Sequence, residues 1–207
     1  EAFEKAGVSP DDIREPEDVR CLPLTTKEDL RQHYPLGFLS VPREDIARIH
    51  GSSGTTGKPT FVAYTAADVE TWANLCARFL TAGGLRRGHM VHIAFGYGLF
   101  TGGFGLHYGV ERTGASVVPA AGGNTPRQIM LLQDLASEVL VCTPSYALQI
   151  AEVAQEQGVD PRSLPLQYGH FGGEPWTEDM RREIEDNLDI YAFNNYAITS
   201  EGRSDIT

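Results

Sequence analysis

The sequence predicts an α/β fold in which a mostly parallel sheet is flanked by helices. From residue 46 onward, short apolar runs alternate with segments of helical periodicity, and this alternation favours parallel strands covered on both faces. The chain has 207 residues, of which 41% are hydrophobic and 22% charged. This balance is typical of a globular domain with a sizeable core.

The predicted elements follow one another along the chain. Residues 1–45 are polar and contain short helical pieces, so we expect a helical N-terminal segment followed by an α/β domain over 46–207. Apolar runs predict strands at 90–95, 115–119, 138–142, 166–171 and 189–194. Threonine caps and first-turn prolines predict helix starts at Thr26, Thr65, Thr125, Pro144 and Thr177.

The charge and the cysteines limit the function classes. The net charge of −11 gives no electrostatic footprint for nucleic acid or anionic membranes. Cys21, Cys76 and Cys142 are far apart in the sequence, and the last two lie in apolar runs. We expect buried thiols in a reducing compartment and therefore a cytoplasmic protein, with no nucleic-acid or membrane partner. No signal peptide or apolar membrane span is recognisable.

A run rich in glycine and hydroxyl residues extends from Arg48 to Pro59. Its glycines permit close backbone approach, its amides and hydroxyls can donate to an anion, and Lys58 adds a positive charge. It differs from a Walker A loop, because five residues lie between Gly51 and Gly57 and a proline follows the lysine. Apolar runs on both sides predict strand–loop–strand. The pattern predicts a phosphate-binding loop, and the alternative is a flexible hairpin without a ligand.

Three strand ends carry unusual residues, and ligands bind at the carboxyl ends of parallel strands. Phe95–Gly105, with five glycines and four aromatic residues, predicts either the wall of a pocket for an aromatic acid or ordinary helix packing. Phe171–Trp176 suits an adenine ring lying on the backbone, or it is a plain turn. Asn194–Glu201 offers an aromatic ring for stacking and oxygen ligands for phosphate and Mg²⁺, or it is a fraying strand end.

The histidines form no recognisable metal motif. His50 precedes the loop and packs there, His92 lies within a predicted strand, His107 lies on a predicted helix, and His170 precedes Gly172. None of them has a cysteine or carboxylate at zinc spacing. The sequence also has no G-x-S-x-G elbow, so it gives no support to serine-hydrolase chemistry.

Several motifs together resemble phenylacetate–coenzyme A ligase, a family of adenylate-forming enzymes. In order along the chain they are R-I-H-G-S-S-G-T-T-G-K-P-T, T-W-A-N, G-Y-G-L-F-T-G-G-F-G-x-H-Y-G, T-P-S-Y and F-G-G-E-P-W-T. The resemblance extends from the first helix to about Tyr196. It implies a piece of the large N-terminal domain of the adenylate-forming fold, without the mobile C-terminal domain.

The resemblance implies an ATP-dependent ligase that joins an aromatic acid to coenzyme A through an acyl-adenylate, with Mg²⁺ at the phosphates. The implied phosphate loop comprises Ser52, Ser53, Gly54, Thr55, Thr56, Gly57 and Lys58. The implied adenine site comprises Gly173, Glu174, Pro175 and Tyr196. The implied acid pocket comprises Phe95, Tyr97, Phe100, Gly102 and Gly172. Lys58 and Thr199 are the implied catalytic residues, and Glu201 the implied Mg²⁺ ligand.

The sequence departs from the family after Tyr196. Ala197 replaces a glycine of the family pattern, and Ser200 stands where a glutamate belongs, so Glu201 fits only one position later. Because the family's catalytic C-terminal domain lies beyond residue 207, we expect the chain alone to be inactive. Two alternatives stay open: an enzyme that loads another aromatic acid onto a carrier, and a non-catalytic adenylate-binding module. An exposed sheet edge would favour a homodimer.

Overall fold

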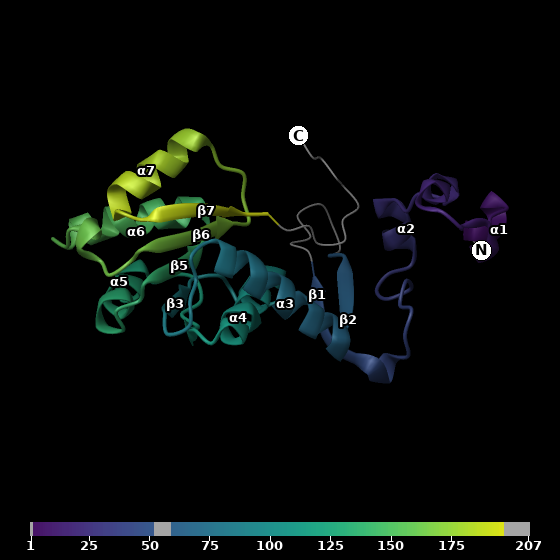
Figure 1. The fold of residues 1–207 in the computed structure, drawn as a ribbon, viewed down its shortest axis with the longest axis horizontal. Coiled ribbons are helices and arrows are strands. Elements are labelled where there is room, and N and C mark those ends of the chain that lie inside the picture. Colours follow the sequence, from purple (N-terminus) through teal and green to yellow (C-terminus); the bar gives the residue numbers. More distant parts are fainter. Residues whose placement is uncertain (1, 52–58, 197–207) are drawn as a thin grey trace.

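The computed structural model describes residues 2–51 and 59–196, which form a helical N-terminal arm, a β-hairpin and a helix-covered sheet (Figure 1). The arm runs from α1 (Ala2–Ala6) to α2 (Lys27–Gln32). Its 3-10 helices are η1 (Pro10–Asp12), η2 (Pro16–Cys21) and η3 (Arg43–Asp45). Because α1 and these 3-10 helices bury no residue, this part of the arm contributes little to the core.

The predicted cap of the second helix is confirmed. The Thr26 hydroxyl accepts a hydrogen bond from the Asp29 amide at 3.3 Å, and the Asp29 carboxylate accepts one from the Thr26 amide at 2.7 Å. This reciprocal capping box satisfies two backbone donors that a helix otherwise leaves unpaired. α2 ends at Gln32, shortly before Pro35, which cannot continue a helix.

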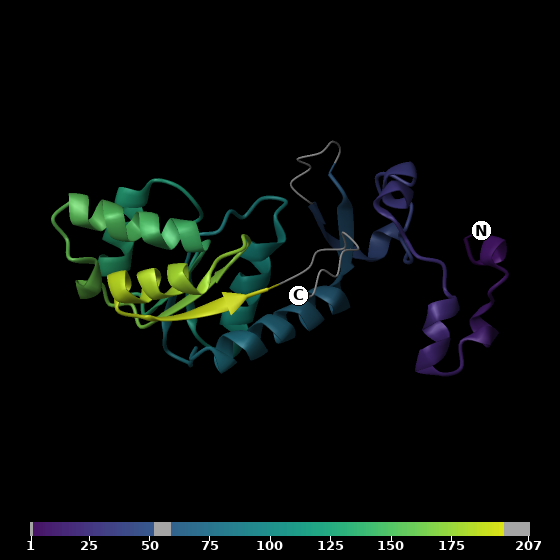
Figure 2. The same ribbon diagram turned by 90° about the horizontal axis from the view of Figure 1, so that it is seen from above.

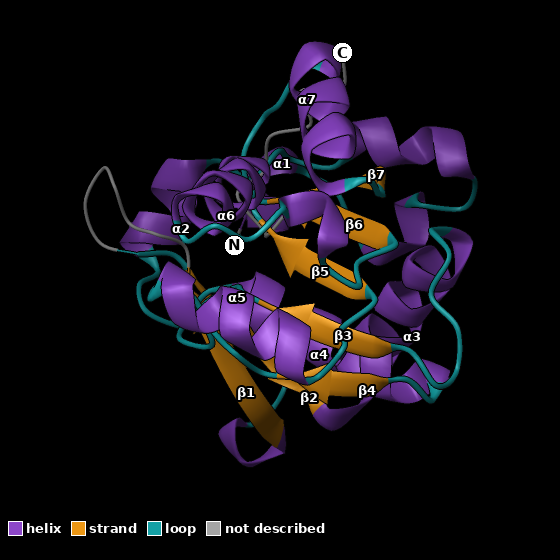
Figure 3. Cartoon of the chain, turned by 90° about the vertical axis from the view of Figure 1, so that its left-hand side faces the viewer, coloured by secondary structure: helices purple, strands orange, loops and turns teal. Residues whose placement is uncertain are grey.

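The predicted parallel sheet is confirmed, with the strand order β4-β3-β5-β6-β7 and every pair parallel (Figure 3). Its strands are β3 (Met90–Ile93), β4 (Ser116–Val118), β5 (Val139–Cys142), β6 (Tyr168–Gly172) and β7 (Tyr191–Asn195). β3 is shorter than the predicted 90–95. Backbone pairing still reaches Ala94, whose amide donates to the Val141 carbonyl at 2.8 Å.

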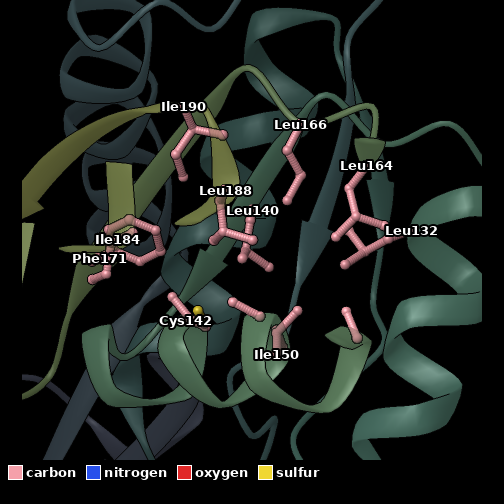
Figure 4. Close-up of a cluster of buried hydrophobic side chains, with 14 of the residues drawn as sticks. Leu132, Leu140, Cys142, Ile150, Leu164, Leu166, Phe171, Ile184, Leu188 and Ile190 are labelled. Atoms are coloured by element: carbon pink, nitrogen blue, oxygen red, sulfur yellow. The ribbon is translucent and has the colours of Figure 1, made fainter. Parts of the chain in front are cut away.

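The central strand β5 separates two apolar clusters. Val139 and Val141 pack with side chains of α3 and α4, whereas Leu140 and Cys142 pack with those of α5, α6 and α7 (Figure 4). This alternation follows from the two-residue period of a strand, and all four side chains are 0% exposed. Burial of each of the valine and leucine side chains contributes about 1.5–3 kcal/mol. The sheet is therefore covered on both faces, as the sequence predicted.

Among the residues that the structure describes, five helices surround the sheet. They are α3 (Ala66–Ala82), α4 (Thr101–Thr113), α5 (Thr125–Asp134), α6 (Pro144–Glu156) and α7 (Glu178–Leu188), and η4 (Pro161–Ser163) follows α6. The N-cap side chains of α3, α5 and α7 accept a hydrogen bond at the helix start. Thr65 and Thr177 cap α3 and α7 as predicted. The predicted cap at Thr125 is wrong by one residue. Asn124 caps α5 through its side-chain oxygen, because its left-handed backbone (φ 50°) turns that oxygen toward the Arg127 amide.

The hairpin stands beside the sheet and is joined to it by α3. β1 (Ile46–Gly51) and β2 (Phe61–Thr65) are antiparallel, which confirms the predicted strand–loop–strand, and α3 contacts both (Figure 2). α3 also packs closely on α4. A Cβ added at Gly105 of α4 would lie only 2.3 Å from the ring of Trp72 of α3. That glycine of the glycine-aromatic segment is therefore required for helix packing.

Cys76 and Cys142 are buried free thiols, as predicted, and Cys21 is exposed. Burial raises the pKa of the Cys76 thiol to about 12, so this thiol is unreactive at neutral pH. Over 2–51 and 59–196, no helix combines the length and the apolar character needed to cross a bilayer.

Candidate functional site

The carboxyl edge of the parallel sheet brings together four residues that follow three different strands. A Cβ added at Gly173 would lie 3.5 Å from Phe95 Cε1, 3.6 Å from Thr143 Cγ2 and 3.9 Å from Phe100 Cζ. The rings of Phe95 and Phe100 are 5.8 Å apart between centroids. We call Phe95, Phe100, Thr143 and Gly173 the edge cluster. It presents two aromatic rings over a backbone that carries no side chain.

The paired glycines after β6 are required by their surroundings. A Cβ at Gly172 would lie 2.4 Å from the Asn195 carbonyl oxygen of the neighbouring strand. Gly173 has φ +84°, a left-handed conformation that other L-residues adopt only with strain. The floor of the edge cluster is therefore bare backbone, which a planar group can approach closely.

Glu174 has a structural contact that the sequence did not predict. Its carboxylate accepts a hydrogen bond from the Ser145 amide at 2.7 Å, at the start of α6. The N-cap residue Thr143 makes no side-chain capping bond there, so the Glu174 carboxylate caps the helix instead. Its negative charge also interacts favourably with the positive end of the helix dipole. Pro175 follows in the connection to α7, and Tyr196 follows β7 with a ring that is 73% exposed.

Tyr97 is turned toward α4. Its hydroxyl lies 3.2 Å from His107 Nδ1, and the other ring nitrogen of His107 lies 3.2 Å from the Glu111 carboxylate. Burial, followed by the nearby Glu111 charge, raises the pKa of Tyr97 to about 12. The spacing of His107 and Glu111, four residues apart on one helix, is the signal from which the His107–Glu111 contact could have been predicted.

Gly102 makes room for an aromatic ring of the edge cluster. A Cβ at this position would lie 2.5 Å from Phe100 Cε1. Of the predicted acid-pocket residues, Phe95 and Phe100 meet directly, Gly102 lies against Phe100, and Gly172 precedes Gly173 in the floor. The structure thus brings four of the five predicted residues to one place, and Tyr97 packs on α4.

The predicted phosphate loop, 52–58, lies outside the described residues, as do Thr199 and Glu201. The strand that enters the loop is nevertheless placed. The Gly51 amide donates to the Leu99 carbonyl at 3.0 Å, and Leu99 directly precedes Phe100 of the edge cluster. β1 therefore ends beside the predicted acid pocket.

Two other buried histidines have structural partners. His92 Nε2 lies 2.5 Å from the Gln128 side-chain oxygen, and His170 Nδ1 lies 3.4 Å from the Asn195 side-chain oxygen. Within the part of the chain that the structure describes, no group of three or more His, Cys, Asp or Glu residues could hold a metal ion.

A cavity of about 250 Å³ lies between the segment after α2 and the strand β2, lined among others by Tyr34, Phe38, Phe61 and Val62. None of the described site residues lines it. It is separate from the carboxyl edge, and we assign it no part in the chemistry.

The fold is similar to that of solved coenzyme A ligases. A 2-hydroxyisobutyryl-CoA ligase, solved in an open conformation with 2-HIB-AMP and CoA, superposes with a TM-score of 0.88 at 30% identity over 95% of this chain and 48% of that one. The N-terminal domain of FACL13 from Mycobacterium tuberculosis superposes with a TM-score of 0.58 at 17% identity over 72% of this chain and 36% of that one, so it shares the fold alone. No protein-family model matches the chain.

In sequence, the chain is similar to phenylacetate-coenzyme A ligases, which confirms the resemblance seen in its motifs. It is 49% identical to the Pseudomonas putida enzyme over 197 residues, 51% to the Thermus thermophilus enzyme over 197 and 50% to the Escherichia coli K12 enzyme over 198. These matches cover 95% of this chain and 44–45% of each relative. The chain therefore spans a little under half the length of these ligases.

Proposed function

We propose that this chain supplies the acid pocket and part of the nucleotide site of a phenylacetate–coenzyme A ligase. In the proposed reaction, a carboxylate oxygen of phenylacetate attacks the α-phosphorus of ATP and displaces pyrophosphate. The thiol sulfur of coenzyme A then attacks the acyl carbon, and AMP leaves as the thiol loses its proton. The observation that carries this proposal is the edge cluster, which offers an aromatic-walled surface beside the entry to the loop.

The edge cluster suits the aromatic ring of the acid. Phe95 is 8% exposed and Phe100 is 46% exposed, so one ring is fixed in the core while the other faces outward. Rigid aromatic rings bury large apolar area and favour offset or edge-to-face contact with another ring. A substrate ring in contact with these two rings would bring its carboxylate near the start of the loop.

The nucleotide roles of the remaining residues rest on the motif resemblance. The loop from Ser52 to Lys58 is assigned to the β- and γ-phosphates, since an anion attacking an anion requires donors and positive charge. Thr199 is assigned to the α-phosphate, and Glu201 to the Mg²⁺ that would further neutralise the phosphates. For adenine, Tyr196 supplies an exposed ring at the end of β7, next to the bare backbone at Gly172 and Gly173.

Binding of an adenylate analogue tests this function. A phenylacetyl sulfamoyl adenosine, which replaces the reactive phosphate by a stable linkage, carries both halves of the proposed intermediate. At one hundred times its Kd it should stabilise the folded chain by about 2.7 kcal/mol, measured as a rise in the unfolding temperature. At the same concentration, sulfamoyl adenosine alone should raise the unfolding temperature by a smaller amount. The proposal would be contradicted if neither compound raised the unfolding temperature.

A variant of the edge cluster makes the test specific. Phe100→Ala removes the more exposed of the two aromatic rings of the edge cluster. This variant should reduce the rise in unfolding temperature caused by the phenylacetyl compound more than the rise caused by sulfamoyl adenosine. An equal loss for the two compounds would contradict an acid pocket at this position.

A further inference from the structure

We infer that His50 is a positioning residue that fixes the start of the nucleotide loop against the segment carrying the acid pocket. This inference rests on the proposed function, which it extends by a residue without a direct contact to substrate. His50 is the second-last residue of β1, and it lies two positions before Ser52, where the predicted loop begins. The residue it holds, Leu99, directly precedes Phe100 of the edge cluster.

Two consecutive residues of β1 donate to one carbonyl group. The Leu99 oxygen accepts a hydrogen bond from the Gly51 amide at 3.0 Å and lies 3.1 Å from His50 Nδ1. A carbonyl oxygen only accepts, so Nδ1 carries the proton in this contact. These two bonds join parts of the chain that are 48 and 49 residues apart in sequence.

The carbonyl belongs to a segment without regular structure. Between the end of β3 at Ile93 and the start of α4 at Thr101, the chain has neither helix nor strand. Leu99 itself is 53% exposed, so its side chain gives little anchorage. The bonds to its carbonyl therefore contribute to the position of the whole segment, including the neighbouring Phe100.

The imidazole is held in place by three rings from three elements. Tyr64 of β2, Trp72 of α3 and Phe104 of α4 lie 5.7, 5.3 and 5.9 Å from it between centroids, each at a steep interplanar angle. His50 is 1% exposed, so its ring has one packed orientation. Rotation about its bonds would break the contact to Leu99 and disturb all three rings.

The surroundings keep His50 neutral. Burial lowers its pKa, and the positive charge of Arg48, on the same face of β1, lowers it further. The Arg48 guanidinium lies 5.1 Å from the centroid of Phe104 and 4.6 Å from that of Tyr108, so it is fixed near the histidine. With Nδ1 protonated, the neutral ring leaves Nε2 bare, and among the described residues Nε2 has no hydrogen-bond partner.

A histidine in this position would couple the two ligand sites. Under the proposed function, the nucleotide contacts residues that follow β1, and the acid contacts the rings that follow β3. The hydrogen bonds from His50 and Gly51 to the Leu99 carbonyl join these two parts of the chain, and we call this contact the Leu99 junction. When one ligand has fixed the residues on its side of the junction, binding of the second ligand costs less conformational entropy. The two ligands should therefore bind with positive cooperativity, and the cooperativity should depend on the His50 donor.

The test compares two substitutions of His50 in the 207-residue chain. His50→Asn keeps an N–H group near the position of Nδ1, whereas His50→Leu fills part of the space and removes the donor. The matched control is His92→Leu, which removes another fully buried histidine but lies away from Leu99. The first readout is the ratio of ATP–Mg²⁺ affinities measured with and without phenylacetate.

We expect His50→Leu to reduce this ratio to about one, and we expect His50→Asn and His92→Leu to keep at least half of the wild-type ratio. The second readout needs no ligand and is amide-hydrogen exchange of the peptides covering 46–51 and 95–101. Loss of one hydrogen bond should speed exchange in both peptides about fivefold in His50→Leu, but not in His50→Asn.

The two readouts separate the inference from the proposed function. If the wild-type chain binds neither ligand, the proposed function fails, and the exchange data still decide whether His50 holds the junction. Unchanged exchange in His50→Leu, or equal acceleration in His92→Leu, would overturn the inference. So would full cooperativity in a folded His50→Leu chain.

Discussion

At the scale of single residues, Gly172 and Gly96 form a matched pair. A Cβ at Gly172 would lie 2.4 Å from a backbone oxygen, whereas a Cβ at Gly96 would meet nothing within 4 Å. We predict that Gly172→Ala lowers the free energy of unfolding by about 1–3 kcal/mol, because backbone has to move. Gly96→Ala should change it by less than about 0.5 kcal/mol. Urea unfolding measures both, and equal effects would contradict the close approach of β6 and β7.

Lys58 offers a second test at this scale, based on the proposed phosphate loop. A charged hydrogen bond to phosphate contributes about 1.5–3 kcal/mol. Lys58→Ala should therefore weaken ATP binding about tenfold or more. Lys5→Ala, which removes the same charge from α1, should leave the affinity near that of the unchanged chain. Equal affinities for the two variants in a direct titration would argue against phosphate contact by Lys58.

At the scale of elements, the start of α6 depends on Glu174, which follows the neighbouring strand β6. Glu174→Ala removes the carboxylate that caps the helix and should lower the free energy of unfolding by about 1 kcal/mol. Glu152→Gln changes a charge within the same helix and should have little effect. If Glu174→Ala is as stable as the wild-type chain, the capping role is wrong.

Local patterns predicted the elements well, because caps and apolar periods are short-range. The caps at Thr26, Thr65 and Thr177 are examples. At the start of α5 two adjacent residues could cap, and the backbone conformation of Asn124 decides between them. Contacts between distant residues were not predictable in this way. Glu174 caps a helix start 29 residues away, and only the topology of the sheet brings the two together.

In the candidate site, too, the sequence predicted which residues share an edge of the sheet but not the contacts between their side chains. The predicted topology placed Phe95 and Gly173 at one edge, because parallel strands end on the same side. It could not show that Tyr97 turns toward α4, since that orientation depends on packing against Phe104 and His107. Nor could it show that His50 reaches the Leu99 carbonyl.

At the scale of the whole molecule, three buried histidines make stability depend on pH. His50, His92 and His170 are each at most 1% exposed, and burial lowers the pKa of each below 6.5. The folded chain keeps them neutral, but the unfolded chain takes up protons below about pH 6.5. Stability should therefore fall as the pH falls from about 7.5 to 5.5, by at most about 1.4 kcal/mol per pH unit for each histidine.

Urea unfolding at several pH values measures this dependence. The capping aspartates Asp18, Asp29 and Asp68 have pKa values lowered from 3.8, so they titrate at lower pH and do not obscure the effect. A chain in which His92 and His170 are both replaced should show a shallower slope. A stability that stays constant between about pH 7.5 and 5.5 would contradict neutral burial of these histidines.

The central claim is that these residues form an acid pocket and enough of a nucleotide site to bind ATP, although the chain spans a little under half the length of the ligases it matches. Calorimetric titration with ATP–Mg²⁺, in the presence and absence of phenylacetate, tests it most directly. We predict that ATP–Mg²⁺ binds and that phenylacetate strengthens the binding. Absence of binding under both conditions would contradict the claim.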